Sequence, residues 1–166
     1  RRLEEKVYGY YAALSGGKEK IHLQYISDLQ QDTLENLLRE NRQKDAILKF
    51  TSMRVHKDEI EFTLNGMPLK KCGSQGQQKS FLVALKLAQF DIMKQLHGVA
   101  PILLLDDVFD KLDMQRVEYL LSLVAGDYFG QIFISDSNKV RMASIVERFT
   151  SECRSIEVTA GNYTAL

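Results

Sequence analysis

The segment PILLLDDVFDKLD, residues 101–113, constrains the fold more than any other part of this sequence. Its four aliphatic residues, 102–105, run directly into two adjacent carboxylates, Asp106 and Asp107. A short apolar strand that ends in acidic residues is typical of a site for Mg²⁺ and a nucleotide, where the metal is held by one or two carboxylates and the phosphates. The usual companion is a glycine-rich loop of the form GxxxxGK[ST], which cradles the phosphates, and the sequence contains no such loop. The segment therefore predicts half of a nucleotide site.

The length of the chain fits one ordinary domain and is small for a complete ATPase. A chain of 166 residues can bury a core without disulfides. Basic and acidic side chains number 22 each, so any contact with DNA must come from local patches. No apolar run approaches the roughly 18 residues of a membrane span, no signal peptide opens the chain, and Cys72 and Cys153 are expected to be reduced. We therefore expect a cytoplasmic protein with no membrane contact.

Helices and strands alternate in the second half of the sequence. The periodicity predicts helices over 77–96, 114–125 and 139–149, and short β-rich strands over 101–106, 131–135 and 154–158. This alternation predicts an α/β fold with a parallel sheet and crossover helices. Ligands of such sheets lie beyond the carboxyl ends of the strands. Asp106 and Asp107 follow one of those ends, and Ser135 and Asp136 follow another.

The first part of the chain has a mixed pattern. We predict a strand over 19–24, a helix over 32–48 with a capping box from Asp32 to Glu35, and a second strand. Ile60, Phe62 and Leu64 are expected on one face of that second strand, and Asn65-Gly66 after it favours a tight hairpin turn. We therefore divide the chain into a mixed helix and strand region, 1–71, and an α/β region, 72–166.

The acid pair has two interpretations. In the functional one, Asp106 holds Mg²⁺ and Asp107 orients or deprotonates the water that attacks a γ-phosphate. In the other, both acids cap the loop that follows the strand. The residue types alone do not decide between them.

A second candidate segment, CGSQGQQKS, covers residues 72–80. Ser74 and Gly76 lie just before a predicted helix, where a hydroxyl and backbone N–H groups can bind an anion. The structural alternative is an N-cap serine and a glycine that lets the chain enter the helix. LSGGKE, residues 14–19, is a competing candidate for the phosphate-contacting signature, but a predicted strand rather than a helix follows it. We therefore predict that Ser15, Gly16 and Gly17 form a helix-to-strand turn.

Together, GSQGQQKS, a helix, ILLLDD and KLD follow the order of the C-terminal half of an ABC-type or SMC-type ATPase head. The segments MRVHKDEIEF, the Asn-Gly hairpin, GSQGQQKSFLVALKLAQ and PILLLDDVFDKLD resemble, more narrowly, the RecF family of bacterial DNA replication and repair proteins. Arg54 and Glu59 depart from the GxHRDD-like segment of that family. The resemblance implies a partial ABC-type ATPase head, with a P-loop NTPase-like parallel sheet and flanking helices, that corresponds to the C-terminal portion of such a protein. The lobe with the phosphate loop would then lie outside this sequence.

The resemblance assigns roles to single residues. Asp106 matches the Walker B metal acid, and Asp107 stands at the catalytic acid. Asp136 stands where many ABC ATPases have a switch histidine. In this family a signature loop contacts the γ-phosphate of ATP held by the opposite subunit, and it matches Ser74, Gln75, Gly76 and Gln77. The D-loop, which crosses the dimer interface, matches Leu112 and Asp113.

The function that the resemblance implies is recombinational DNA repair. It implies ATP and Mg²⁺ as cofactors, single- or double-stranded DNA as a ligand, an ATP-bound homodimer, and RecR and RecO as partners. The full-length protein is expected to be a weak, DNA-stimulated ATPase, and this chain to be inactive alone. Two alternatives remain: a half-domain of another ABC-type ATPase, and a non-catalytic interaction module.

Overall fold

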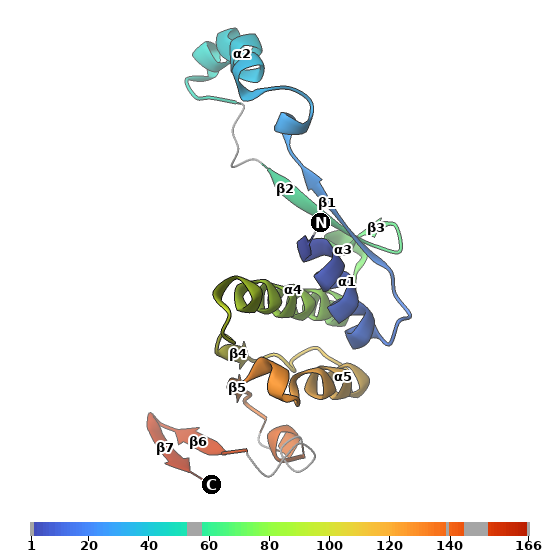
Figure 1. Ribbon diagram of the computed structural model, residues 1–166, viewed down its shortest axis with the longest axis vertical. Helices are drawn as coiled ribbons and strands as arrows, with labels where there is room; N and C mark the ends of the chain where they lie inside the picture. Colours follow the sequence, from blue (N-terminus) through green and yellow to red (C-terminus); the bar gives the residue numbers. More distant parts are fainter. Residues whose placement is uncertain (1, 53–57, 139, 145–152, 166) are drawn as a thin grey trace. The chain divides into compact units, whose positions relative to one another are not determined.

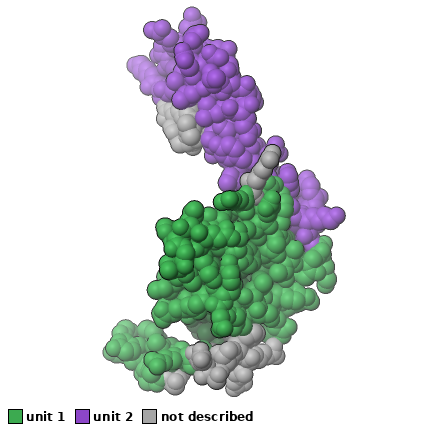
Figure 2. Space-filling model, in the orientation of Figure 1, with its two compact units in different colours: residues 1–18, 75–166 green, residues 19–74 purple. Residues whose placement is uncertain are grey.

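The computed structural model describes residues 2–52, 58–138, 140–144 and 153–165, which form two compact units (Figure 2). Unit 1 comprises Arg1–Lys18 and Gln75–Leu166, and unit 2 comprises Glu19–Ser74. This division differs from the predicted boundary after residue 71, because the first helix packs with the second half of the chain. Arg54 lies outside the described residues.

Three helices form the core of unit 1: α1 (Arg2–Ser15), α4 (Gln75–His97) and α5 (Met114–Val124) (Figure 1). The helix α1 packs against both α4 and α5. Val7, Tyr11 and Leu14 lie on one face of α1 and are almost wholly buried, as the helical repeat of 3.6 residues requires. The α4 helix contributes Ala84, Leu87 and Ala88 to this core. The helix that the sequence predicts over 77–96 is confirmed.

A buried carboxylate ties these helices to a short 3₁₀ helix, η3 (Asp127–Phe129). Asp91 of α4 accepts hydrogen bonds from Lys6 Nζ at 2.8 Å, Tyr10 Oη at 2.9 Å and Tyr128 Oη at 2.8 Å. Burial opposes the charge on Asp91, but the hydrogen bonds from Lys6 and the two tyrosines outweigh it and hold the pKa of Asp91 below its usual range. The same carboxylate therefore stabilises the packing of α1, α4 and η3.

A parallel pair of strands carries the predicted acids. The strands β4 (Leu103–Asp106) and β5 (Ile132–Ser135) pair from Leu103↔Ile132 to Asp106↔Ser135, and α5 lies between them in the sequence. This β–α–β unit confirms the predicted α/β class and the parallel pairing. Leu103 and Leu105 point into the core, whereas Leu104 and Asp106 are exposed, as the alternation of a strand requires.

The last predicted strand has a different partner from the one expected. The strand β6 (Ile156–Thr159) pairs with β7 (Asn162–Ala165) in a separate antiparallel hairpin, not with the parallel sheet. The reason is the turn Ala160-Gly161, whose φ angles of 50° and 81° fold the chain directly back on itself. Of the predicted helix over 139–149, residues 140–144 are helical, and the rest lies outside the described residues.

Unit 2 contains an antiparallel sheet in the order β1 (Ile21–Ile26), β2 (Glu59–Leu64) and β3 (Met67–Pro68), followed by the short helix α3 (Leu69–Cys72). Asn65 and Gly66 have φ angles of 50° and 81°, which confirms the predicted tight turn between β2 and β3. Leu64 is buried and Phe62 half-buried, but Ile60 is 43% exposed. The apolar face predicted for this strand is therefore covered only at its carboxyl end.

The helix α2 (Leu34–Leu48) of unit 2 follows a 3₁₀ turn, η1 (Asp28–Gln30), and confirms the predicted helix. Its predicted cap is wrong by one residue. Thr33 has extended backbone angles and its hydroxyl accepts the N–H of Asn36 at 3.3 Å, so Thr33 is the N-cap. Asp32 instead accepts the side-chain amide of Asn36 at 2.9 Å.

Candidate functional site

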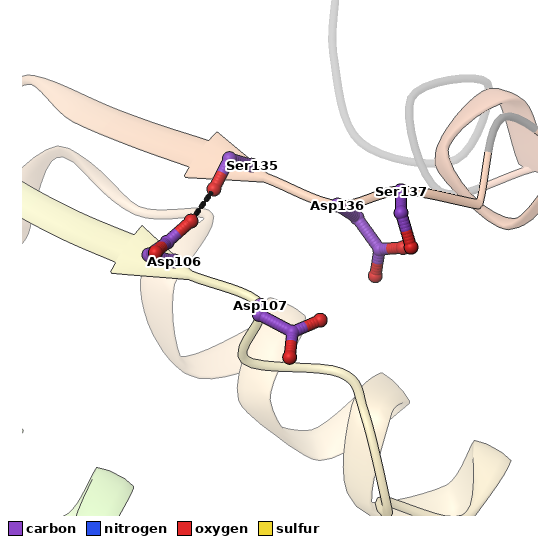
Figure 3. A pocket seen from close by; sticks show the side chains of 5 residues that line it. All are labelled: Asp106, Asp107, Ser135, Asp136 and Ser137. Atoms are coloured by element: carbon purple, nitrogen blue, oxygen red, sulfur yellow. Dashed lines mark hydrogen bonds between the residues drawn. The ribbon is translucent and has the colours of Figure 1, made fainter.

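The carboxyl ends of β4 and β5 form the candidate site (Figure 3). Asp106 and Ser135 lie opposite each other in the register, and the Ser135 hydroxyl donates a hydrogen bond to the Asp106 carboxylate. The backbone N–H of Asp107 donates to the Ser135 carbonyl at 3.1 Å, which extends the pairing by one residue. The two strands therefore fix the backbone of both acids.

Asp107 has a left-handed backbone, with φ of 47°. Among non-glycine residues, aspartate tolerates this conformation better than most. The next two residues, Val108 and Phe109, are buried and anchor the loop to the core. Within the described ranges no hydrogen-bond donor contacts the Asp107 carboxylate, which is exposed beyond the strand. The backbone carbonyl of Asp107 accepts the Asp110 N–H at 3.4 Å, so the turn after β4 is closed by its main chain and not by its carboxylate.

Asp136 follows β5 and is engaged within the protein. Its side chain is fully covered and forms an ion pair with Arg141, with Arg141 Nη2 2.7 Å from Oδ2. The backbone N–H of Asn138 donates to Oδ1 at 2.7 Å. Burial opposes the charge on Asp136, but the bonds from Arg141 and Asn138 prevail and lower its pKa. Arg141 was not among the residues predicted from the sequence, although Asn138 is a typical N-cap residue and its Oδ1 accepts the Arg141 N–H at 3.0 Å.

The acids face an open depression of about 390 Å³ at the strand ends. Five residues line it: Asp106, Asp107, Ser135, Asp136 and Ser137 (Figure 3). Carboxylate and hydroxyl oxygens are the hard ligands that Mg²⁺ prefers. In the described part of the chain, no three His, Cys, Asp or Glu side chains converge as a metal cage. The donor set therefore fits a Mg²⁺ ion that takes its remaining ligands from water and phosphate.

The predicted signature segment lies where helix α4 begins, outside the depression. Ser74 is exposed and directly precedes α4, whose first residues are Gln75, Gly76 and Gln77. A Cβ atom at Gly76 would lie 3.0 Å from the Lys111 carbonyl oxygen, a tight contact that the Lys111 backbone would have to relieve by a shift of a few tenths of an ångström. The glycine therefore has a structural role whether or not a nucleotide binds nearby.

The predicted D-loop lies beside that glycine. Lys111 has a left-handed backbone, with φ of 65°, and the Leu112 N–H donates to the Phe109 carbonyl at 3.2 Å. Asp113 is the N-cap of α5, since its carboxylate accepts the Arg116 N–H at 2.9 Å. The structure thus brings Asp106, Asp107 and Asp136 to one depression. It also brings Gly76 against Lys111, next to the predicted D-loop.

The competing sequence LSGGKE forms a turn. Gly16 and Gly17 have φ angles of 64° and 72°, and the Gly17 N–H donates to the Ala12 carbonyl at 2.8 Å as α1 ends. A Cβ at Gly16 would lie 3.1 Å from the Tyr119 hydroxyl. The predicted helix-to-strand turn is confirmed, since β1 follows at Ile21.

Curated sequences resemble this chain over most of its length, although no family model matches it. The DNA replication and repair protein RecF of Bacteroides thetaiotaomicron is 45% identical over 152 residues, 92% of this chain and 41% of that protein. RecF of Flavobacterium johnsoniae is 49% identical over 138 residues, 83% of this chain and 38% of that protein. RecF of Porphyromonas gingivalis is 49% identical over 153 residues, 91% of this chain and 42% of that protein. The chain therefore spans 38–42% of the length of these relatives.

Solved structures share the fold. The recombination mediator protein RecF with ATP aligns over 99% of this chain and 45% of its own, with a TM-score of 0.72 and 22% identity. A structure from work on ATP-driven dimerization and DNA-stimulated activation of SMC ATPases aligns over 99% of this chain and 82% of its own, with a TM-score of 0.59 and 15% identity. At these identities the alignments show the fold alone, which is that of an ATPase head.

None of the helices in the described ranges has the length and apolar character to cross a bilayer. The extent of the sequence match fits the expected C-terminal portion of a longer protein. Over 83–92% of its own length, the chain is therefore similar in sequence to part of RecF, a DNA replication and repair protein.

Proposed function

We propose that this chain is the part of a DNA replication and repair ATPase that supplies the Walker B acids, the signature and the D-loop to an ATP site. One observation carries the proposal. Asp106 and Asp107 stand at the end of a parallel strand, and the Asp107 carboxylate is exposed in a left-handed turn without a hydrogen-bond donor from the described residues. Such a carboxylate is available to a substrate.

Asp106 is proposed to hold Mg²⁺, with the Ser135 hydroxyl keeping its carboxylate in place. The metal, when bound, supplies positive charge that neutralises phosphate oxygens. Asp107 is proposed to accept a proton from the attacking water or to orient it. Support for this role comes from the sequence position of Asp107, directly after the proposed metal acid, because ligands of parallel sheets bind beyond the carboxyl ends of the strands.

The signature residues Ser74, Gln75, Gly76 and Gln77 are proposed to contact ATP held by a second copy of the protein, and Leu112 and Asp113 to cross the interface between the copies. Support comes from their location outside the acidic depression. A site whose parts are supplied by two copies of one chain can be completed in a symmetric dimer, where each copy supplies both parts.

Asp136 stands where many ABC ATPases have a switch histidine, so this position carries a carboxylate and not an imidazole. Asp136 is fully covered and bound to Arg141, so we propose that it positions this arginine and does not itself contact the γ-phosphate. Arg141 Nη1 also lies 3.4 Å from the Phe109 carbonyl in the loop after Asp107. The pair therefore joins the loop after β5 to the loop after β4.

The biological role follows from the family. We propose that the full-length protein works in the cytoplasm on single- or double-stranded DNA, as an ATP-dependent homodimer, with RecR and RecO as partners. This chain by itself is proposed not to bind ATP tightly, because Asp106 and a signature serine cannot replace a backbone cradle and its lysine. Titration calorimetry of the chain with Mg-ATP is expected to show no saturable heat at micromolar concentrations.

ATP hydrolysis by the full-length protein, with and without DNA, tests the proposed function. We expect slow hydrolysis that DNA stimulates. A half-domain of another ABC-type ATPase that does not act on DNA would hydrolyse ATP without responding to DNA, and a non-catalytic interaction module would not hydrolyse it. Either result would contradict the proposal.

A further inference from the structure

The first turn of α4 and the D-loop are packed directly on each other in unit 1. The Lys111 carbonyl oxygen stands 3.0 Å from the position of a Cβ atom at Gly76, so the two backbones meet with no side chain between them. Lys111 itself is held in a left-handed conformation, with φ of 65°. A backbone contact of this kind keeps its geometry only if other bonds fix both segments.

Arg116 of α5 supplies such bonds on the side of the D-loop. Its backbone N–H donates to Asp113 Oδ1 at 2.9 Å, and its Nε lies 3.2 Å from Asp113 Oδ2. The D-loop aspartate is therefore bound twice by one residue, through the backbone and through the guanidinium.

The other arm of the same guanidinium reaches the signature helix. Arg116 Nη1 donates to the Ser80 hydroxyl oxygen at 3.0 Å, and that hydroxyl donates its own proton to the Gly76 carbonyl at 2.8 Å. A continuous chain of hydrogen bonds thus runs from Asp113 through Arg116 and Ser80 to Gly76.

The bonds among Asp113, Arg116 and Ser80 are largely shielded from solvent on the Arg116 and Ser80 side. Ser80 is 1% exposed and the Arg116 side chain 13% exposed. The guanidinium is planar, and its donors point in fixed directions, so Nε and Nη1 are both satisfied only when Asp113 and Ser80 keep one separation. Lysine has a single ammonium group on a flexible stem and cannot impose that separation.

We propose that Arg116 is a positioning residue that, through Ser80, locks the D-loop to the first turn of α4. The two segments then keep one geometry and approach a partner molecule as a single surface. The consequence for ATP-dependent dimerisation rests on the proposed function, whereas the locking itself does not.

Amide hydrogen exchange on this chain tests the lock without ATP. If the lock exists, Ser80→Ala speeds exchange at Leu112 and Arg116, and Arg116→Lys speeds exchange at residues 79–81, each by about fivefold or more, within the range of coupling between contacting residues. The matched control is Ser122→Ala on the exposed face of α5, whose hydroxyl makes the same type of bond to the Glu118 carbonyl at 2.8 Å. This control is expected to leave both segments unchanged. Effects confined to the helix that carries each substitution would overturn the lock.

Dimerisation of the full-length protein tests the consequence. Ser80→Ala is expected to weaken ATP-induced dimerisation about tenfold and to leave the monomer's affinity for ATP within about twofold, because Ser80 lies in the lock and not in the phosphate cradle. A wild-type protein that does not dimerise with ATP would refute the proposed function, while reciprocal exchange effects would still support the lock. A Ser80→Ala protein that dimerises as the wild type does would overturn the role of the lock in assembly.

Discussion

Two aspartates of unit 1 occupy opposite environments, Asp91 on α4 and Asp107 after β4. Asp91 is 8% exposed and accepts hydrogen bonds from Lys6, Tyr10 and Tyr128. Asp107 is exposed and has a backbone φ of 47°, and its carboxylate receives no hydrogen bond from any described donor. The same side chain is thus used once to hold helices together and once at an open edge.

The comparison shows how a structural carboxylate differs from one available for chemistry. A buried carboxylate must have donors, because an unpaired buried charge strongly destabilises the folded state. An exposed carboxylate in a left-handed turn carries a conformational cost of about 1–3 kcal/mol that local packing must offset. Val108 and Phe109, both buried, provide that packing next to Asp107.

The largest expected effect is on hydrolysis. In the full-length protein, Asp107→Asn is expected to slow ATP hydrolysis by roughly 10²- to 10⁴-fold, as expected for loss of a general base. ATP binding should persist, and ATP-dependent dimers should live longer. The measurement is steady-state phosphate release, with Asp110→Asn in the same loop as the control, since the Asp110 carboxylate forms an ion pair with the exposed Lys111 at 3.5 Å. Unchanged turnover in Asp107→Asn would remove the proposed catalytic role.

For the stability of the fold, we expect Asp91 to matter more than Asp107. Asp91→Asn is expected to lower the free energy of unfolding of this chain by about 2–4 kcal/mol, because three donors lose a charged acceptor. Asp107→Asn is expected to change it by less than about 0.5 kcal/mol, as for most surface substitutions. Urea denaturation of both variants measures the contrast. Equal losses in the two variants would show that the acids are not distinguished as described.

A smaller effect appears in the pH dependence of stability. The pKa of Asp91 is lowered on folding, so its contribution is fully present above the unfolded value, near 4, and is lost as the pH falls through the folded value. The difference in unfolding free energy between the wild type and Asp91→Asn is therefore constant from about pH 7 to 5 and narrows below about pH 4. Denaturation at several pH values gives this difference. A difference that stays constant down to about pH 3 would contradict the assignment.

Much of the fold and part of the site were predictable from the sequence. The strand end at Asp106, the helix α4 and the turn at Asn65-Gly66 follow from apolar periodicity and turn chemistry, which are local properties. The capping residue of α2 was decided between two neighbouring local candidates, since Thr33 accepts the Asn36 N–H and Asp32 accepts the Asn36 side-chain amide. The exposure of Ile60 depended on tertiary packing, which the local pattern does not contain. The pairing of β6 with β7 depended on Ala160-Gly161, a turn without the usual asparagine or aspartate signal.

The contacts that connect the site were not predictable. Arg141 reaches back five residues to Asp136, and Arg116 reaches a serine 36 residues earlier in the chain. Neither distance corresponds to a helical or strand repeat that a sequence pattern could reveal. Such contacts become visible only when the elements are placed in three dimensions.

Light scattering of the full-length protein with and without ATP tests the central claim most directly. Ser74 directly precedes α4 and is exposed, so an arginine there should leave ATP affinity intact and fill the place of the partner's γ-phosphate. We expect Ser74→Arg to abolish ATP-induced dimers, because each defect occurs twice in a symmetric interface, and Ser122→Arg on the exposed face of α5 to retain them. Dimers of Ser74→Arg that form with ATP as readily as those of the wild type would contradict the claim that this chain completes its partner's ATP site.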